Sequence, residues 1–208
     1  MISIFIDTSL SNVSISIIKD NKILSLIEKN IPNAHSIYTT SFLDKALKES
    51  GVSPYEVDNI YVINGPGSFT GLRIGVTIAK TYGYLIKKDL TPVSSLKSYA
   101  LSTDLPFPIM SIIPANKTHY YIGIYNDHYE PIVKEEFASH DTIKELIDTY
   151  HPSLVGPDST ILGDYQINKV SLNILNIINY YQDKEKVNYF KLVPNYLKLP
   201  QAIEDKNK

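Results

Sequence analysis

The feature that most constrains the fold of this chain is a glycine-rich stretch, GPGSFTGLRIG, at residues 65–75. It follows a short apolar run at residues 60–63 and precedes residues 70–86, whose apolar positions recur with the period of a helix. Glycine allows positive φ angles and a close approach of neighbouring backbone. The stretch therefore predicts a tight turn from a buried strand into a helix, as in an α/β fold.

The same stretch could bind an anion. Ser68 or Thr70 can cap the predicted helix and leave its backbone amides facing outward, and such a helix N-terminus attracts negative charge. The stretch has no lysine followed by serine or threonine, so it is not a Walker A loop, and its spacing differs from the dinucleotide-binding fingerprint. A structural turn and an anion-binding loop that includes Gly65, Gly67 and Ser68 both stay open.

The helix predicted at residues 70–86 has two apolar flanks. Small residues recur at every fourth position of one flank, where another backbone could approach closely: Gly75, Ala79 and Gly83. The other flank carries Ile74, Ile78 and Leu85. A helix that is apolar on two sides is expected to be buried on two sides. Either the chain itself covers both flanks, or one flank is a docking surface for a partner, with Arg73 near its first turn.

Asp7, Thr8 and Ser9 follow the first predicted strand, residues 2–6. A carboxylate suits magnesium and hydroxyls donate hydrogen bonds to phosphate oxygens, so the three residues are candidates for nucleotide binding together with the glycine-rich stretch. An Asx-type turn between two strands is the structural alternative.

The predicted elements recur in a similar order in the two halves of the chain. In the first half we expect strands at residues 2–6, 13–17, 23–28, 60–63 and 91–93, helices at residues 34–49 and 70–86, and a short helix after residue 94. In the second half we expect strands at residues 109–113, 120–125, 132–137 and 153–156, and helices that end at residue 150 and span residues 170–181. Asn33 is the expected cap of the first helix, and Gly51 follows its end. The repetition predicts two lobes, residues 1–104 and a smaller lobe at residues 105–208.

Composition excludes several classes of function. A formal net charge of -2 gives no overall positive field for holding a polyanion, and the absence of cysteine excludes disulfides and thiolate chemistry. Asp7 interrupts the apolar start too early for a signal peptide, and no apolar run is long enough to span a bilayer. We therefore expect a soluble protein of the cytoplasm.

Four segments resemble the TsaB family, also called YeaZ: residues 4–9, 65–75, 92–96 and 194–198. The resemblance spans essentially the whole chain, and residues 65–75 carry its most specific motif. It implies a duplicated actin-like ATPase fold (ASKHA, ribonuclease H-like) with two lobes.

The resemblance also implies a function. The implied function is that of a non-catalytic scaffold and activator that pairs with TsaD. TsaD is the subunit that transfers a threonylcarbamoyl group to the adenosine beside the anticodon of transfer RNA. Helices at residues 34–49 and 70–86 would contact TsaD. The expected contact residues are Leu72, Arg73, Gly75, Val76, Ala79 and Gly83.

Further partners follow from the same resemblance. A TsaE-like ATPase is expected in the complex, which would bind the transfer RNA, while the chain alone would not. The chain itself would need no cofactor or metal, and ATP with magnesium would act at the level of the complex. Independently of the resemblance, an exposed apolar patch would allow a homodimer when the catalytic partner is missing.

Two catalytic functions stay open as alternatives to the scaffold function. A weak nucleotide-binding ATPase or kinase would use residues 7–9, but the matching run of the second half, IIPAN at residues 112–116, has no acid, and related TsaB proteins commonly have aspartate where Pro114 stands. A glycoprotease-like metallopeptidase would need two histidines on the first long helix, where this chain offers only His35.

Overall fold

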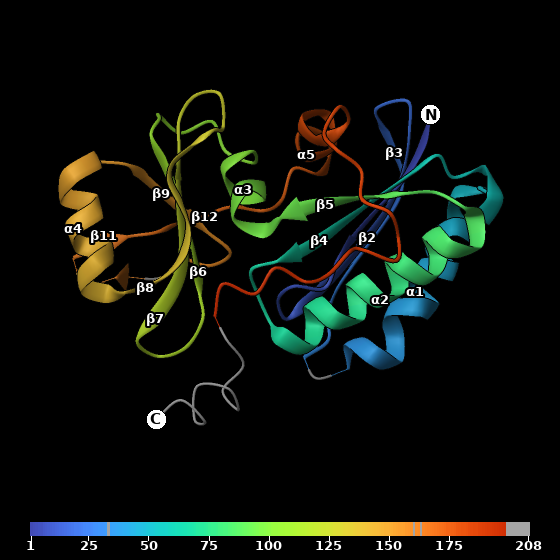
Figure 1. Ribbon diagram of the computed structural model, residues 1–208, viewed down its shortest axis with the longest axis horizontal. Helices are drawn as coiled ribbons and strands as arrows, with labels where there is room; N and C mark the ends of the chain where they lie inside the picture. Colours follow the sequence, from blue (N-terminus) through green and yellow to red (C-terminus); the bar gives the residue numbers. More distant parts are fainter. Residues whose placement is uncertain (33, 160, 163, 199–208) are drawn as a thin grey trace.

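The computed structural model describes residues 1–32, 34–159, 161–162 and 164–198, and it folds into two lobes, each built on a five-stranded sheet (Figure 1). The first sheet contains β1 (Ile2–Asp7), β2 (Asn12–Lys19), β3 (Lys22–Asn30), β4 (Asn59–Gly65) and β5 (Leu90–Ser94). The second contains β6 (Ile109–Pro114), β7 (His119–Tyr125), β8 (Pro131–Ser139), β9 (Ser153–Gly156) and β12 (Asn168–Lys169).

The two sheets share one topology. The first has the order β3-β2-β1-β4-β5 and the second, read from its β8 edge, the order β8-β7-β6-β9-β12. In each sheet three strands form an antiparallel meander, and two further strands are added in parallel on the other side of the first strand. This arrangement confirms the predicted duplicated, two-lobed α/β fold.

Helices cover the sheets on both faces (Figure 1). The first lobe carries α1 (His35–Ser50), the 3-10 turn η1 (Pro54–Glu56) and α2 (Phe69–Ile86), and α3 (Ser95–Ala100) follows β5. The second half adds α4 (His140–Tyr150), a small hairpin of β10 (Ile161–Leu162) and β11 (Tyr165–Gln166), and finally α5 (Ile174–Tyr181).

Strand alternation divides the core into layers. On one face of the first sheet, Ile4 and Ile15 pack with Leu43 of α1 and Ala79 of α2. On the other face, Phe5 and its neighbours pack with α5. In the second lobe α4 covers one face of the sheet, and α3 packs against the face that points toward the first lobe. Because successive residues of a strand point to opposite faces, the continuous buried runs of β1, β4 and β6 bury both faces of each sheet at its centre.

Side-chain caps define several helix ends. Ser68 rather than Thr70 caps α2, because its Oγ accepts a hydrogen bond from the Gly71 amide at 3.3 Å. Gly51 ends α1 in the left-handed conformation, with φ 67°, as expected. The expected cap of α1, Asn33, lies outside the described residues.

Two predictions about the second half need correction. The helix expected at residues 170–181 begins only at Ile174, because Asn168 and Lys169 pair with β9 and the Val170 amide donates to the carbonyl of Gly156. The β10–β11 hairpin has no counterpart among the predicted elements. Both errors concern two-residue strands, which are too short to show a period in the sequence.

The chain returns to the first lobe at α5, and the residues after this helix stay on that lobe. Val187 and Leu90 exchange backbone hydrogen bonds of 2.7 and 2.9 Å, and the Asn195 amide donates to Asn64 O at 2.6 Å. This C-terminal segment, residues 187–198, therefore extends along β4 and α2. The division of the chain at residue 104 stays a prediction. In the part of the chain that the structure describes, no helix is long and apolar enough to cross a membrane.

Candidate functional site

The glycine-rich stretch packs directly on the turn between β1 and β2. A Cβ atom at Gly67 would lie only 2.5 Å from the carbonyl oxygen of Ser9, and one at Gly71 or Gly75 would lie even closer to Thr8. Two of these three contacts are with backbone oxygens, which cannot rotate away as a side chain can. The glycines are therefore required by the close approach of α2 to this turn.

Hydrogen bonds hold the turn and the helix together. Thr8 Oγ1 donates to the carbonyl of Gly71 at 2.7 Å, and the Ser68 amide donates to Ser9 O at the same distance. Asp7 Oδ1 accepts the Ser9 amide at 2.8 Å, which is the Asx-type turn given above as the structural alternative. Thr8 and Ser9 are buried, and their polar groups take part in this packing.

The carboxyl group of Asp7 is buried as well. Burial raises its pKa above the ordinary value of 3.8, hydrogen bonds from Ser9 oppose this rise, and the neighbouring Glu28 adds to it. The structure gives this carboxylate no lysine or arginine partner among the described ion pairs.

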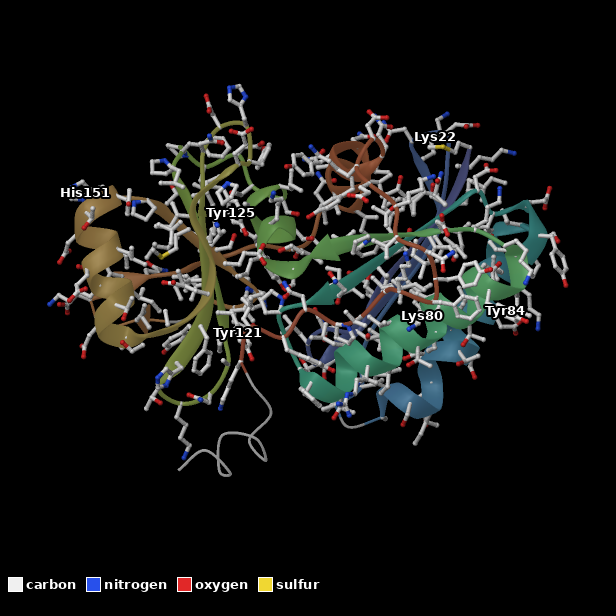
Figure 2. All side chains as sticks on the ribbon, in the orientation of Figure 1. Lys22, Lys80, Tyr84, Tyr121, Tyr125 and His151 are labelled. Carbon is white, nitrogen blue, oxygen red and sulfur yellow. The ribbon has the colours of Figure 1, made fainter. Side chains whose placement is uncertain are left out.

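A cavity of about 780 Å³ lies beside the N-terminus of α2, between the two lobes. Its walls include Gly67, Ser68 and Phe69 from the first lobe and Pro114 and Tyr121 from the second, and Lys198 of the C-terminal segment also lines it. Figure 2 shows Tyr121 on the side of the second sheet that faces the first lobe.

The six candidate nucleotide-binding residues do not line one cavity. Gly67 and Ser68 line the cavity just described, whereas Asp7 lines a second cavity of about 430 Å³. Thr8 and Ser9, in the turn between β1 and β2, are buried against the start of α2. Gly65, with φ 138°, instead faces the backbone of Asn195 in the C-terminal segment.

The small-residue flank of α2 faces the chain's own first sheet. Its members are buried and pack on β1, β4 and β5 or on the β1–β2 turn: Leu72, Gly75, Val76, Ala79 and Gly83. These five expected partner contacts are therefore not on the surface of the chain. The physical reason is that the missing or short side chains let α2 approach its own sheet. The spacing of small residues along the helix does not say whether the sheet or a partner protein packs against them.

Arg73 is exposed on α2 and contacts the C-terminal segment. Its guanidinium lies 4.1 Å from the ring centroid of Phe69, and its Nε donates to the Tyr196 hydroxyl at 3.0 Å. The Phe69 and Tyr196 rings stack with centroids 4.3 Å apart. This contact was not foreseen, although residues 194–198 had been singled out as a motif.

Further along α2, Lys80 and Tyr84 also meet the C-terminal segment (Figure 2). Lys80 Nζ donates to the carbonyls of Phe190 and Leu192, and Tyr84 packs edge-on against Tyr189. The segment thus covers one side of α2 along most of its length.

The opposite side of α2, next to α1, carries an apolar surface that is partly open to solvent. We call it the α1–α2 face, and it consists of Ile37, Tyr38, Ile74, Ile78 and Leu85. Ile37 is 67% exposed and Leu85 60% exposed, while Ile74 and Ile78 are half-buried between the helices. Three of its members, Ile74, Ile78 and Leu85, form the second flank recognised from the sequence.

The histidine expected near the start of α1 is structural in this arrangement. His35 is buried, and its Nε2 lies 2.8 Å from the carbonyl oxygen of Leu10. Within residues 1–32, 34–159, 161–162 and 164–198, no group of three or more histidine, cysteine, aspartate or glutamate side chains could hold a metal ion.

Known proteins resemble this chain over most of its length. The family model of TsaD, tRNA N6-adenosine threonylcarbamoyltransferase, matches residues 26–173. The tRNA threonylcarbamoyladenosine biosynthesis protein TsaB of Bacillus subtilis is 27% identical over 222 residues, covering 95% of this chain and 94% of the relative. A tRNA N6-adenosine threonylcarbamoyltransferase of Malacoplasma penetrans is 31% identical, but the match covers 54% of this chain and only 43% of that protein.

Solved structures agree on the fold. YeaZ from Pseudomonas aeruginosa superposes with a TM-score of 0.77 at 19% identity, covering 94% of this chain and 99% of that chain. A second crystal structure, of a protein with similarity to peptidase YEAZ from Pseudomonas aeruginosa, gives a TM-score of 0.78 at 19% identity, with 95% and 99% covered. With the family match and the full-length TsaB relative, these findings show that the chain belongs to the TsaD family and, within it, to the TsaB (YeaZ) group.

Proposed function

We propose that this chain is a non-catalytic subunit in tRNA threonylcarbamoyladenosine biosynthesis, where it binds and activates a TsaD-like transferase in the cytoplasm. The near full-length match to a TsaB protein supports the pathway. In this proposal a TsaE-like ATPase and the transfer RNA join the complex through the catalytic subunit. ATP and magnesium act there as well.

The observation that carries the proposal is the α1–α2 face. Ile37 and Leu85 each expose most of their side chain, although the core beneath them is complete. Exposed apolar side chains on two adjacent helices are typical of a surface that a partner covers. The contact surface that we propose is therefore this face, in place of the buried small-residue flank. In the absence of the catalytic subunit, the same face would pair two copies of the chain.

The arrangement of the polar groups supports a role without catalysis. The Thr8 hydroxyl and the Ser9 carbonyl make hydrogen bonds that hold α2 to the turn, and the Ser9 amide donates to Asp7. Pro114 stands at the end of β6, where the first lobe has Asp7 at the end of β1. A proline offers no carboxylate to hold magnesium or to orient water.

Charge placed on the α1–α2 face tests the proposal. The double variant Ile37→Glu/Leu85→Glu is expected to weaken binding to a TsaD-like subunit by about 100-fold, because two carboxylates would have to be desolvated in an apolar interface. Calorimetry would measure the binding, and a threonylcarbamoyl-transfer assay would measure the activation.

The matched control is Ile132→Glu, on β8 of the second lobe, where the side chain is 43% exposed. This variant is expected to bind and to activate like the wild type. Equal loss of binding in the control and the double variant, or no loss in either, would contradict the proposed surface.

Weak nucleotide binding is a second candidate function, favoured by the 780 Å³ cavity at the N-terminus of α2. Tyr121 in its lining could stack on a base, and Lys198 could contact phosphate. Calorimetry of the isolated chain with ATP and magnesium tests it. Micromolar binding with turnover would favour this candidate, and no binding would exclude it.

A further inference from the structure

Three polar residues form a row across the meander of the first sheet. In the strand register Asp7 of β1 faces Ser14 of β2, and Ser14 faces Glu28 of β3. Residues opposite each other in antiparallel strands point to the same side of the sheet. The side chains of the row therefore share the face that is turned away from α1 and α2.

The middle residue of the row is buried without a partner. Ser14 is only 6% exposed, and its Oγ has no hydrogen-bond partner among the described residues. A buried hydroxyl that makes no hydrogen bond costs free energy, so native structures seldom leave one unpaired. Ser14 lines the 430 Å³ cavity together with both ends of the row.

The cavity lies between the two lobes. Tyr99 of α3 lines it, as do Asp158 and Lys169 of the second lobe. Burial and the carboxylates of Asp7 and Asp158 raise the pKa of Tyr99, so that its hydroxyl remains protonated. On the side of the first sheet, Asn12 and Asn30 are joined by a 2.7 Å hydrogen bond at the rim.

The charge in this cavity is unbalanced. Three carboxylates line it, those of Asp7, Glu28 and Asp158, against one ammonium, that of Lys169. Lys169 Nζ lies 3.6 Å from Asp158 Oδ1 and so balances the acid on its own wall. The acids of the row have no such partner among the described ion pairs, and a ligand that complements them must carry positive charge.

The spacing of the row selects the kind of cation. Facing Cα atoms in an antiparallel pair are about 4.5–5.5 Å apart, so the Cα atoms of Asp7 and Glu28 lie about 10 Å apart across three strands. Among the described residues no group of three or more histidine, cysteine, aspartate or glutamate side chains could hold a metal ion, and the row supplies only two carboxylates. A linear molecule with an ammonium group at each end could reach both.

We infer that this cavity binds an aliphatic diamine, with one ammonium on Asp7 and the Ser14 hydroxyl and the other on Glu28. Ser14 Oγ accepts a hydrogen bond from the ammonium next to Asp7, and the alkyl chain between the two ammonium groups lies across β2. The second sheet has no such row, because the register that joins its three meander strands brings together Ile113, Tyr121 and Phe137. The site is independent of the α1–α2 face.

Calorimetry with putrescine on the purified full-length chain tests the inference. At low ionic strength, putrescine is expected to bind about tenfold more tightly than butylamine, because only the diamine reaches both carboxylates. Glu28→Gln should reduce putrescine affinity to nearly that of butylamine. Ser14→Ala should weaken the binding of both amines by about three- to tenfold, because it removes a hydrogen bond next to a charge.

The control is Glu145→Gln, an exposed residue on α4, which should leave the affinity unchanged. Circular dichroism confirms that each variant is folded; Glu28 and Glu145 are both exposed, so neither replacement disturbs the core. Absence of putrescine binding, equal affinity for putrescine and butylamine, or an unchanged affinity in Glu28→Gln would each overturn the inference. Displacement of putrescine by magnesium at equal concentration would also overturn it.

Discussion

The two lobes share one strand order but differ in their last crossover. In the first lobe α2 connects β4 to β5, and it lies beside α1. In the second lobe the segment between β9 and β12 holds the short β10–β11 hairpin, while α4 takes the place of α1. Only the first lobe therefore presents two adjacent helices among the described residues. The docking surface that we propose therefore depends on the one helix by which the first lobe exceeds the second.

The lobes also differ on the faces that they turn toward each other. At the end of the first sheet the strands bring together Asp7, Ser14 and Glu28, whereas the second sheet brings together Ile113, Tyr121 and Phe137. The same topology thus supports a polar, acidic wall on one side and an apolar, aromatic wall on the other. Topology sets the positions of the side chains, and the residue types decide what the positions can bind.

The largest effect is expected from adding a methyl group where α2 meets the β1–β2 turn. Gly71→Ala would force its Cβ against the backbone oxygen of Thr8 and is expected to lower the free energy of unfolding by about 3 kcal/mol. Gly51→Ala, with open space around it but φ 67°, should cost about 1 kcal/mol from backbone strain alone. Urea denaturation would measure the free energy of unfolding of both variants. An equal loss in both would mean that contact with the β1–β2 turn is not the reason for glycine at position 71.

A smaller effect is expected where the lobes are joined by hydrogen bonds. Glu135 of β8 accepts from the hydroxyl of Tyr125 at 2.8 Å and from that of Ser94, which ends β5 of the first lobe. Glu135→Ala should lower the free energy of unfolding by about 2 kcal/mol, because two partly buried donors lose a charged acceptor. The exposed neighbour Glu136→Ala should change it by less than about 0.5 kcal/mol. A similar, small change in both variants would show that this contact does not stabilise the pair of lobes.

The smallest expected effect is a pH dependence of the free energy of unfolding, caused by Asp7. The row Ile113, Tyr121 and Phe137 of the second sheet contains no acid that could cause the same effect. The folded-state pKa of Asp7 is raised from 3.8 by burial, with Glu28 adding to the rise and His35 opposing it. Its contribution to stability is therefore fully present below pH 3.8 and is lost as the pH rises through the folded-state value. Asp7→Asn, which keeps an acceptor for the Ser9 amide, should be more stable than the wild type at pH 7, and this advantage should shrink toward pH 4.

Urea titrations at several pH values would measure this difference. The exposed Asp104→Asn is the control for the loss of an acid, and it is expected to change the free energy of unfolding at pH 7 by less than about 0.5 kcal/mol. An advantage of Asp7→Asn that grows as the pH falls would contradict the assignment of a raised pKa to the buried carboxyl.

Much of the fold followed from local patterns. Short apolar runs, and strict alternation at residues 13–17, predicted strands of both meanders, and the glycine-rich stretch predicted the turn into α2. These signals depend only on neighbours in the sequence. Of the two expected caps, Ser68 and Thr70, the structure has Ser68. The strands β10, β11 and β12 were missed, since two residues cannot display a period.

The candidate site depended on tertiary contacts that no local pattern contains. The sequence shows that α2 has two apolar flanks, but it does not show which flank faces the sheet. The structure places Thr8 against Gly75 and Leu90 against Gly83, both far away in the sequence. The return of residues 187–198 onto α2 was equally hidden, because Arg73 and Tyr196 are far apart in the sequence. The row that includes Ser14 required the exact register of three strands.

Amide hydrogen exchange of the chain, alone and with a TsaD-like subunit, tests most directly the claim that the first lobe carries the docking surface. The account predicts that binding slows exchange in α1 and α2 and leaves exchange in α4 and β8 unchanged. Slower exchange in α4 or β8, with α1 and α2 unaffected, would contradict it.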